Sequence, residues 1–292
     1  MISYFQSIVI GLLQGVTELV PISSLGHSVL LPDWLGWHNL VKAESADESF
    51  YLAFVVALHV ATALALLVHY RETWVRIVRG FFTSIGKRRI DTPDERLAWL
   101  LVVGTIPVGI TGLVLEHFLR TVFAKPAAAA AFLMVNGLLL LLGERLRRQA
   151  ADRAADTSAV EPPGRDLATL DLREAGLIGV AQTAALFAGI SRSGVTMSGG
   201  LLRGLNHEDA ARFSFLLATP VIFAAGIYKL PDLAGPLGDG VRSQALVGAI
   251  AAFVAATLAV RFLERWFERR TLTPFAIYCL VAGALSTAHL AL

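Results

Sequence analysis

Two apolar stretches of the chain contain clustered polar and ionisable side chains. The first, QGVTELVPISSLGHS, begins at residue 14 and carries an acid, an imidazole and two adjacent hydroxyls: Glu18, His27, Ser23 and Ser24. The second, QTAALFAGISRSGVT, begins at residue 182 and carries a guanidinium flanked by hydroxyls. Ionisable groups in apolar stretches are costly to bury and are candidates for function. Together they supply a nucleophile, a base, a cationic clamp and oxygen ligands for a hard cation, a set that suits phosphoryl chemistry.

The spacing within the first stretch predicts how its side chains meet. Gln14 and Glu18 are four residues apart, so they share one face of a helix. The proline that follows ends this helix, and Ser23 or Ser24 can cap the next one. His27 follows Ser24 within one helical turn. We therefore expect a hydroxyl–imidazole pair between these two residues.

The second stretch has the composition of an anion-binding turn. Gly189 and Gly194 flank a short polar segment whose amides and hydroxyls can surround an anion. The guanidinium within it is a planar fork suited to phosphate. The candidate anion ligands are Ser191, Arg192, Ser193 and Thr196.

Each of these side chains also has a purely structural interpretation. Hydroxyls in apolar helices often bond back to the helix, which is the role we expect for Ser28. Glu18 and Arg192 can form a structural ion pair between the two stretches. His59 and His69 are lone histidines in an apolar run, and we assign them to packing or to the membrane interface. The combination of groups, rather than any single one, favours the functional interpretation.

The composition is that of an integral membrane protein. The chain has 292 residues, of which 55% are hydrophobic and 16% charged, and its mean hydropathy is +0.62. A soluble domain carries roughly a quarter charged residues. Cys279 is the only cysteine, which excludes an intramolecular disulfide and a thiolate metal cluster. We expect a lipid bilayer as partner and no nucleic acid.

Six runs are long and apolar enough to span a bilayer, which takes about 20 helical residues. None of them contains Asp, Glu, Lys or Arg, and they cover about 51–69, 97–115, 126–142, 213–228, 243–260 and 273–291. Two further apolar regions, about 2–36 and 174–203, are interrupted by Pro, Gly and clustered Ser. These two regions contain the polar stretches described above.

Basic residues predict the orientation, because Lys and Arg are enriched in cytoplasmic connections. Nineteen of the 25 Lys and Arg residues lie in connections on one side, within 70–96, 143–173, 203–212 and 261–272. Five lie on the other side, including Lys42, and the remaining one is Arg192. If the six spans alternate, each interrupted region must begin and end on the same side. We therefore predict two re-entrant hairpins, one from each face, with both chain termini outside.

The two interrupted regions also align with each other at an offset of 168 residues. Five of the sixteen positions 11–26 are identical in this alignment, pairing Gly11 with Gly179, Gln14 with Gln182, Ile22 with Ile190, Ser23 with Ser191, and Gly26 with Gly194. Inverted repeats with broken helices place a polar site near the membrane midplane. We predict an all-α integral membrane protein with six transmembrane helices and two re-entrant helical hairpins in inverted-topology repeats. The repeats cover 1–142 and 174–292, and 143–173 is a cytoplasmic linker.

At these residues the sequence resembles the undecaprenyl-pyrophosphate phosphatase family, the bacterial bacitracin-resistance proteins. That family's first motif is Glu or Gln, three residues, Glu, and then Pro-x-Ser-Ser-x-Gly-His. The chain matches it with Gln14, Glu18, Pro21, Ser23, Ser24, Gly26 and His27. The second motif, Pro-Gly-x-Ser-Arg-Ser-Gly-x-Thr, is matched by Gly189, Ser191, Arg192, Ser193, Gly194 and Thr196. The resemblance extends to FSFLLATP at 213–220 and RRTLTPFAIY at 269–278.

Three positions depart from the family pattern. Ala188 replaces the usual proline, Leu25 stands where a small hydroxyl residue is common, and Cys279 stands where an arginine often follows the tyrosine. None of these changes removes a core catalytic group.

The resemblance implies hydrolysis of undecaprenyl pyrophosphate to the monophosphate and phosphate, which recycles the lipid carrier of cell-wall synthesis. It implies a bacterial plasma-membrane enzyme with a divalent cation, Ca²⁺ or Mg²⁺, and an active site open to the outer face. Arg192 would hold the phosphates, and Glu18, with Gln14, would ligate the cation. The other motif residues would bind substrate phosphate: Ser23, Gly26, Ser191, Ser193, Gly194 and Thr196. A homodimer is a candidate assembly.

The identity of the nucleophile stays open at the level of sequence. We favour Ser24 activated by His27, with Glu18 orienting the imidazole. Direct attack by His27 and attack by metal-activated water are the alternatives.

A different function, transport of undecaprenyl phosphate alone or alongside hydrolysis, is also open. Secondary transporters likewise use inverted repeats and broken helices. Hydrolysis needs the nucleophile and base, whereas transport needs only binding and alternating access. Ser24→Ala should therefore abolish hydrolysis and leave pure transport largely intact.

Overall fold

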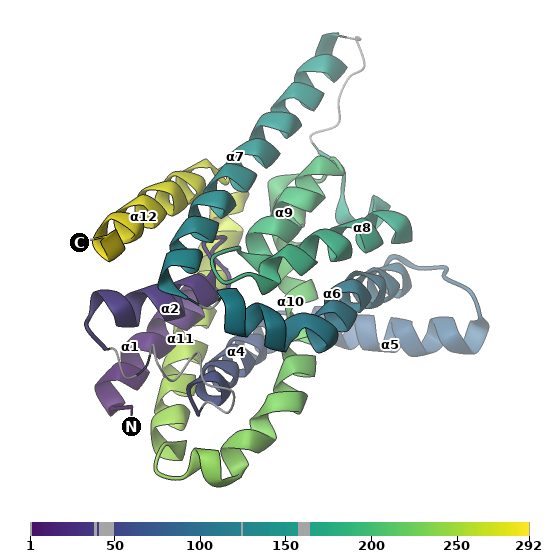
Figure 1. Ribbon diagram of the computed structural model, residues 1–292. Coiled ribbons are helices and arrows are strands. Elements are labelled where there is room, and N and C mark those ends of the chain that lie inside the picture. The colour runs from purple at the N-terminus through teal and green to yellow at the C-terminus, as the bar shows by residue number, and fades with distance from the viewer. Residues whose placement is uncertain (1, 38–39, 41–49, 124, 157–163, 292) are drawn as a thin grey trace.

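The structure is a computed structural model that describes residues 2–37, 40, 50–123, 125–156 and 164–291. Regular structure in these ranges is helical apart from one isolated bridge between Arg165 and Leu205. The helices form a bundle in which neighbouring axes cross in several directions (Figure 1). Lys42, one of the residues used to predict orientation, lies outside the described residues.

Among the described residues, six helices are long and apolar enough to cross a membrane, as predicted. They are α4 (Phe50–His69), α6 (Pro93–Phe123), α7 (Pro126–Asp156), α10 (His207–Ala234), α11 (Arg242–Phe267) and α12 (Thr273–Ala291). Several extend beyond the predicted apolar runs, because charged residues continue the same helix into the flanking polar region. The prediction of an all-α membrane protein is confirmed.

Each interrupted region forms two short helices joined by a connection. We call this connection, together with the first turn of the helix that follows it, the tip; the two tips cover 18–27 and 183–196. The first pair is α1 (Tyr4–Thr17) and α2 (Ser24–Trp34), and the second is α8 (Leu172–Gln182) and α9 (Arg192–Leu202), with the short helix η2 (Thr183–Leu186) after α8. The longest of these has 14 residues and is about 21 Å long, whereas a hydrocarbon core is about 30 Å thick. None is long enough to cross alone. The re-entrant path of the two pairs stays a prediction.

One pair of glycines shared by the two regions has equivalent structural roles. Gly11 packs against the backbone of Gly248 in α11, and Gly179 packs in the same way against Gly104 in α6. In each case a Cβ would collide with a backbone carbonyl, so only glycine permits these crossings. These matching contacts support the predicted internal repeat. The repeat boundaries and their inverted orientation stay predictions.

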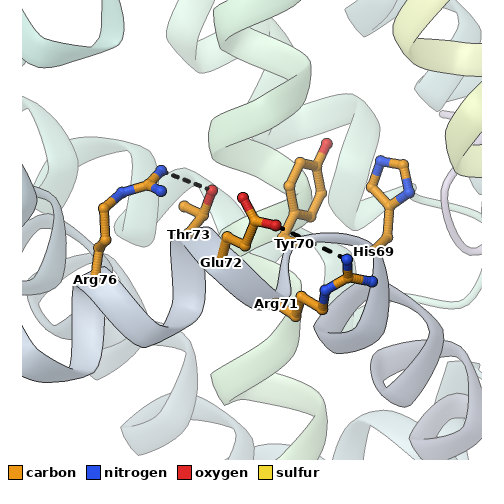
Figure 2. A pocket seen from close by; sticks show the side chains of 6 residues that line it. All are labelled: His69, Tyr70, Arg71, Glu72, Thr73 and Arg76. Atoms are coloured by element: carbon orange, nitrogen blue, oxygen red, sulfur yellow. Dashed lines mark hydrogen bonds and ion pairs between the residues drawn. The ribbon is translucent and has the colours of Figure 1, made fainter.

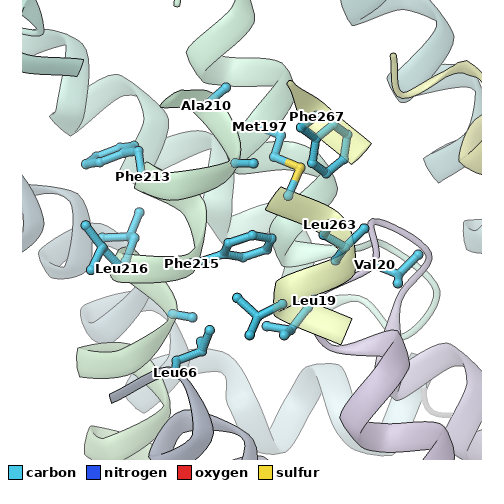
Figure 3. Close-up of a cluster of buried hydrophobic side chains, with 14 of the residues drawn as sticks. Leu19, Val20, Leu66, Met197, Ala210, Phe213, Phe215, Leu216, Leu263 and Phe267 are labelled. Atoms are coloured by element: carbon cyan, nitrogen blue, oxygen red, sulfur yellow. The ribbon is translucent and has the colours of Figure 1, made fainter. Parts of the chain in front are cut away.

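A buried apolar cluster supports the tip between α1 and α2. Leu19 and Val20 of this tip lie beside Phe215 of α10 and Leu263 of α11 (Figure 3). Within a bilayer such side chains stabilise the fold through close van der Waals packing between helices, because lipid tails are as apolar as they are. Segments far apart in the sequence are thereby held against the tip.

Two of the predicted connections between spans contain helix. The basic segment after α4 contains an additional helix, α5 (Arg71–Lys87). The first half of the predicted linker 143–173 continues α7 to Asp156, and this end of α7 projects from the bundle (Figure 1). Residues 157–163 lie outside the described part of the chain, and a short helix, η1 (Leu167–Thr169), precedes α8. A further short helix, η3 (Pro236–Gly238), connects α10 and α11.

Candidate active site

The two tips are joined directly through Ser23. Its hydroxyl accepts hydrogen bonds from the amides of Gly26 and of Gly189, each at 3.2 Å. Ser23 is therefore both the cap of α2 and a link to the second tip. Gly189 has φ +109°, and a Cβ there would collide with the backbone of α7. The spacing predicted the cap, but only the fold reveals the link between tips.

Asn136 of α7 is a second link that the sequence did not predict. Its Nδ2 donates to the Pro21 carbonyl at 3.0 Å, and its Oδ1 accepts from the Ser191 amide at 3.0 Å. The side chain is fully buried. One amide thus satisfies a buried backbone group on each tip, where an unpaired group would be costly. A lone asparagine in an apolar run was the only signal in the sequence.

Glu18 is the point at which the two tips converge chemically. Its Oε1 accepts from Arg192 Nη2 at 3.2 Å, across the two tips. Its Oε2 accepts from Ser24 Oγ at 2.6 Å and from Gln14 Nε2 at 3.2 Å. Because Glu18 is only 7% exposed, these charge-assisted bonds replace the water it loses on burial. The predicted face shared by Gln14 and Glu18 is confirmed.

His59 of α4 is also part of this cluster. Its Nε2 lies 3.2 Å from Glu18 Oε2 and 3.5 Å from Ser24 Oγ. Its Nδ1 faces the Val55 carbonyl at 2.8 Å and must carry a proton to bond there. The assignment of His59 to packing or the membrane interface was wrong, because α4 brings a residue 35 positions beyond Ser24 to the same carboxylate.

His27 does not form the predicted pair with Ser24. Its Nδ1 bonds the Ser23 carbonyl at 2.7 Å, and its Nε2 lies 2.8 Å from the hydroxyl of Tyr278 in α12. A carbonyl accepts only from a protonated nitrogen, so Nδ1 donates and Nε2 accepts from the tyrosine. The imidazole also stacks on that ring. Glu18 accordingly contacts His59 and not His27.

The polar groups of the second tip hold the tip itself together. The Ser191 hydroxyl accepts from the Gly194 amide at 3.0 Å and caps α9, and it lies 3.0 Å from Ser193 Oγ. Thr196 Oγ1 donates to Ser214 Oγ at 2.6 Å. The amides of Gly189, Ser191 and Gly194 already have protein acceptors, so these three amides are not available as donors to an anion in this arrangement. Among the tip groups, Arg192 stays the main candidate for anion binding.

Comparison with known proteins shows the family to which this sequence is similar. The family model described as bacitracin resistance protein BacA matches residues 7–285. The chain belongs to this family.

Individual relatives cover nearly the whole chain. The protein named Undecaprenyl-diphosphatase of Mycolicibacterium paratuberculosis (strain ATCC BAA-968 / K-10) is 59% identical, over 100% of this chain and 98% of its own. Undecaprenyl-diphosphatase 2 of Frankia alni (strain DSM 45986 / CECT 9034 / ACN14a) is 54% identical, over 100% and 99%. Undecaprenyl-diphosphatase 2 of Burkholderia orbicola (strain AU 1054) is 44% identical, over 94% and 92%.

The three departures from the family pattern lie around the tips. Ala188 is buried next to Gly189, and Leu25 is half-buried against the apolar core. Cys279 is buried beside Asn136, whose Nδ2 lies 3.3 Å from its sulfur. None of these three positions is one of the residues that contact Glu18 in the description above.

Two buried polar atoms of the cluster are left for a ligand. Oε1 of Gln14 and Nε of Arg192 have no hydrogen-bond partner among the described residues. Arg192 is otherwise held by Glu18 and by the Ser214 carbonyl, which accepts from Nη1 at 3.1 Å. An unpaired buried donor and an unpaired buried acceptor each cost free energy unless something binds there. A phosphate oxygen is a suitable partner for Nε of Arg192, and a cation is a suitable partner for Oε1 of Gln14.

The oxygen atoms present fit a divalent cation whose coordination shell is completed by oxygens of the substrate. Glu18 and the unpaired oxygen of Gln14 would supply two neighbouring oxygen ligands. Mg²⁺ is commonly held by one or two carboxylates together with substrate phosphates and water. Within the described ranges, no group of three or more His, Cys, Asp or Glu side chains could hold a metal. The described part of the site therefore does not supply a full set of such protein ligands to a metal ion.

Proposed function

We propose that this protein hydrolyses undecaprenyl diphosphate to undecaprenyl phosphate and phosphate. The names of the relatives, the BacA family match and the six apolar helices support this reaction in a membrane. The single observation that carries it is the convergence of Ser24, Arg192 and His59 on Glu18. A hydroxyl, a carboxylate and a guanidinium in one buried cluster match the needs of phosphoryl transfer.

In the proposed reaction Arg192 binds the terminal phosphate. Its guanidinium neutralises charge that builds on the phosphate oxygens as the bond to the leaving group breaks. The unpaired Nε gives it a free donor without breaking its bonds to Glu18 and to the Ser214 carbonyl. The polyprenyl chain stays in the bilayer while its diphosphate reaches the cluster.

Ser24 is the proposed nucleophile. Its hydroxyl already donates to Glu18 at 2.6 Å, so the carboxylate is in place to take the proton as Oγ attacks phosphorus. The phosphoanhydride bond breaks and undecaprenyl phosphate leaves. Water then attacks the phosphorus of the phosphoserine, the bond from phosphorus to Oγ breaks, Glu18 returns its proton to Oγ, and dihydrogen phosphate is released. Attack by His27 would first require the loss of its hydrogen bond to Tyr278.

A divalent cation would be held by Glu18 and Gln14, where it would neutralise phosphate charge. An active site open to the outer face of a bacterial plasma membrane, with both termini outside, is part of the proposal. The distribution of Lys and Arg supports that orientation. A homodimer stays a prediction from the sequence.

Phosphate release from undecaprenyl diphosphate by the purified protein in detergent–lipid micelles tests the reaction. We expect release by the wild type and a loss of roughly 1,000-fold or more in Ser24→Ala. Ser28→Ala is the matched control, because Ser28 lies on the same helix and its hydroxyl donates back to the Leu25 carbonyl at 2.9 Å. Release should also fall with chelator and return with Mg²⁺ or Ca²⁺ if the cation takes part.

The chemistry of a trapped phosphoenzyme identifies the nucleophile. A phosphoserine survives acid, whereas a phosphohistidine is lost in acid and survives base. No phosphate release by a folded wild type in either cation would overturn the proposed function. Transport of undecaprenyl phosphate by the same protein would then be the activity to measure.

A further inference from the structure

The helix α5 begins and ends at the same membrane boundary. It follows directly after α4, which ends at His69, and it precedes α6, which begins at Pro93. Both neighbours are candidate membrane spans. With 17 residues, four of them Arg or Lys, α5 does not itself qualify as a span. It must therefore stay close to the boundary between hydrocarbon and headgroups.

The surface of α5 is divided into three faces. One face is buried, packs against α6 and contains Thr73, Ile77, Gly80 and Ser84. A second is apolar yet exposed and contains Val75, Val78, Phe82 and Ile85, with Phe82 66% exposed. The third is polar and contains Glu72, Arg76, Arg79 and Lys87. A helix with separate apolar and basic faces is typical of one that lies in a membrane interface.

Both ends of α5 are anchored, so this orientation is fixed. At its start, Glu264 of α11 accepts from Tyr70 at 2.7 Å and contacts His69 Nε2 at 2.8 Å. Burial and the neighbouring carboxylate raise the pKa of Tyr70, which therefore remains a donor. Towards its end, Ser84 Oγ accepts from Trp99 Nε1 of α6 at 2.9 Å. The exposed apolar face cannot rotate into the bundle.

A hollow at the start of α5 contains two arginines. It has a volume of about 240 Å³ and is lined by Arg71, Arg76, Thr73, Glu72, Tyr70 and His69 (Figure 2). Arg76 donates to Thr73 Oγ1 at 3.2 Å and its Nε lies 3.6 Å from Asp94 of α6, and Arg71 lies 3.8 Å from Glu72; all four charged side chains are solvent-exposed. An adjoining hollow is lined by the same two arginines, Glu72 and Val75. Cationic groups therefore lie directly beside the beginning of the exposed apolar face.

We propose that α5 lies in the headgroup layer and that Arg71 and Arg76 bind the phosphate of an anionic phospholipid of the bilayer. The apolar face would contact acyl chains, and the polar face would contact water. An arginine fork suits a phosphate diester, and basic residues at a bilayer surface favour anionic lipids. This inference does not depend on the proposed reaction.

The depth of α5 is tested with spin labels on single cysteines in a Cys279→Ala background, in lipid nanodiscs. Two pairs of adjacent residues serve as matched positions: Val78 with Arg79, and Phe82 with Thr83. We expect the Val78 and Phe82 labels to be relaxed by oxygen, which concentrates in lipid. The Arg79 and Thr83 labels should be relaxed by a water-soluble nickel chelate. Equal exposure of all four labels to the chelate would overturn the interfacial placement.

Lipid binding is tested by comparing phosphatidylcholine nanodiscs with and without phosphatidylglycerol. We expect phosphatidylglycerol to raise the unfolding temperature of the wild type. The apparent affinity for phosphatidylglycerol should be roughly tenfold weaker in the double variant Arg71→Gln/Arg76→Gln. Arg145→Gln/Arg148→Gln removes the same charge from exposed positions on α7 and should retain the wild-type affinity. Equal losses in both double variants, or no response in the wild type, would overturn the arginine site.

Discussion

Replacement of Arg192 by alanine is expected to reduce phosphate release from undecaprenyl diphosphate by roughly 1,000-fold. Arg192 is the only basic side chain of the second tip, and it faces Glu18 of the first. The variant loses the group that neutralises the phosphate in the transition state. It also removes the ion pair between Glu18 and this guanidinium. The measurement is the initial rate of release under saturating and limiting substrate.

Two further arginine variants make this result specific. Arg192→Lys keeps the charge but cannot bond Glu18, the Ser214 carbonyl and a phosphate with one planar group, so most of the loss should remain. Arg203→Ala, at the exposed C-terminal end of the same helix, should leave the rate unchanged. A rate within threefold of wild type in Arg192→Ala would contradict a role for this residue in phosphate binding.

Replacement of His59 by leucine is expected to reduce the rate by roughly 100-fold. The imidazole contacts the oxygen of Glu18 that also accepts from Ser24, so its loss changes both the position and the hydrogen bonding of that carboxylate. His59→Gln keeps a side-chain N–H that can reach Glu18 and should recover at least a tenth of the wild-type rate. The effect should fall mainly on kcat, because His59 orients the reacting groups.

The structural alternative for His59 predicts a different pattern. If the side chain only fills space, leucine should be tolerated better than glutamine, since it is apolar and of similar volume. His69→Gln, on the same helix but bonded to Glu264, is the matched control and should retain the wild-type rate. Equal rates in His59→Leu and the wild type would contradict a positioning role.

The sequence predicts the parts of this site that depend on local spacing. Gln14 and Glu18 meet because four residues are one helical turn, and Ser23 and Ser191 each cap the helix that follows. The six spans follow from apolar length alone. The shared glycines also have a physical cause in close helix crossings.

The contacts that cross the fold were not predictable in the same way. His59 and Asn136 each look like a lone polar residue in an apolar helix, and nothing in their neighbours indicates a partner on a distant tip. His27 was paired with Ser24 because they are close in sequence. In the folded chain, however, α12 supplies Tyr278 to its imidazole. Spacing fixes neighbours along one helix, whereas tertiary packing decides which helix faces the site.

The helix α5 was missed for a related reason. Its basic residues marked it as a polar connection, and this obscured the apolar positions spaced three and four apart between them. The same residues that predict orientation therefore also form an amphipathic helix.

The most direct test of the account is the rate of phosphate release by Glu18→Gln. Glutamine has almost the same shape, but it cannot accept the Ser24 proton and it lacks the charge that pairs with Arg192 and His59. We predict a loss of at least 100-fold in a variant that is expressed and elutes as the wild type does, with Glu18→Asp recovering part of the rate. A near-wild-type rate in Glu18→Gln would contradict the claim that this carboxylate joins the two tips into one catalytic site.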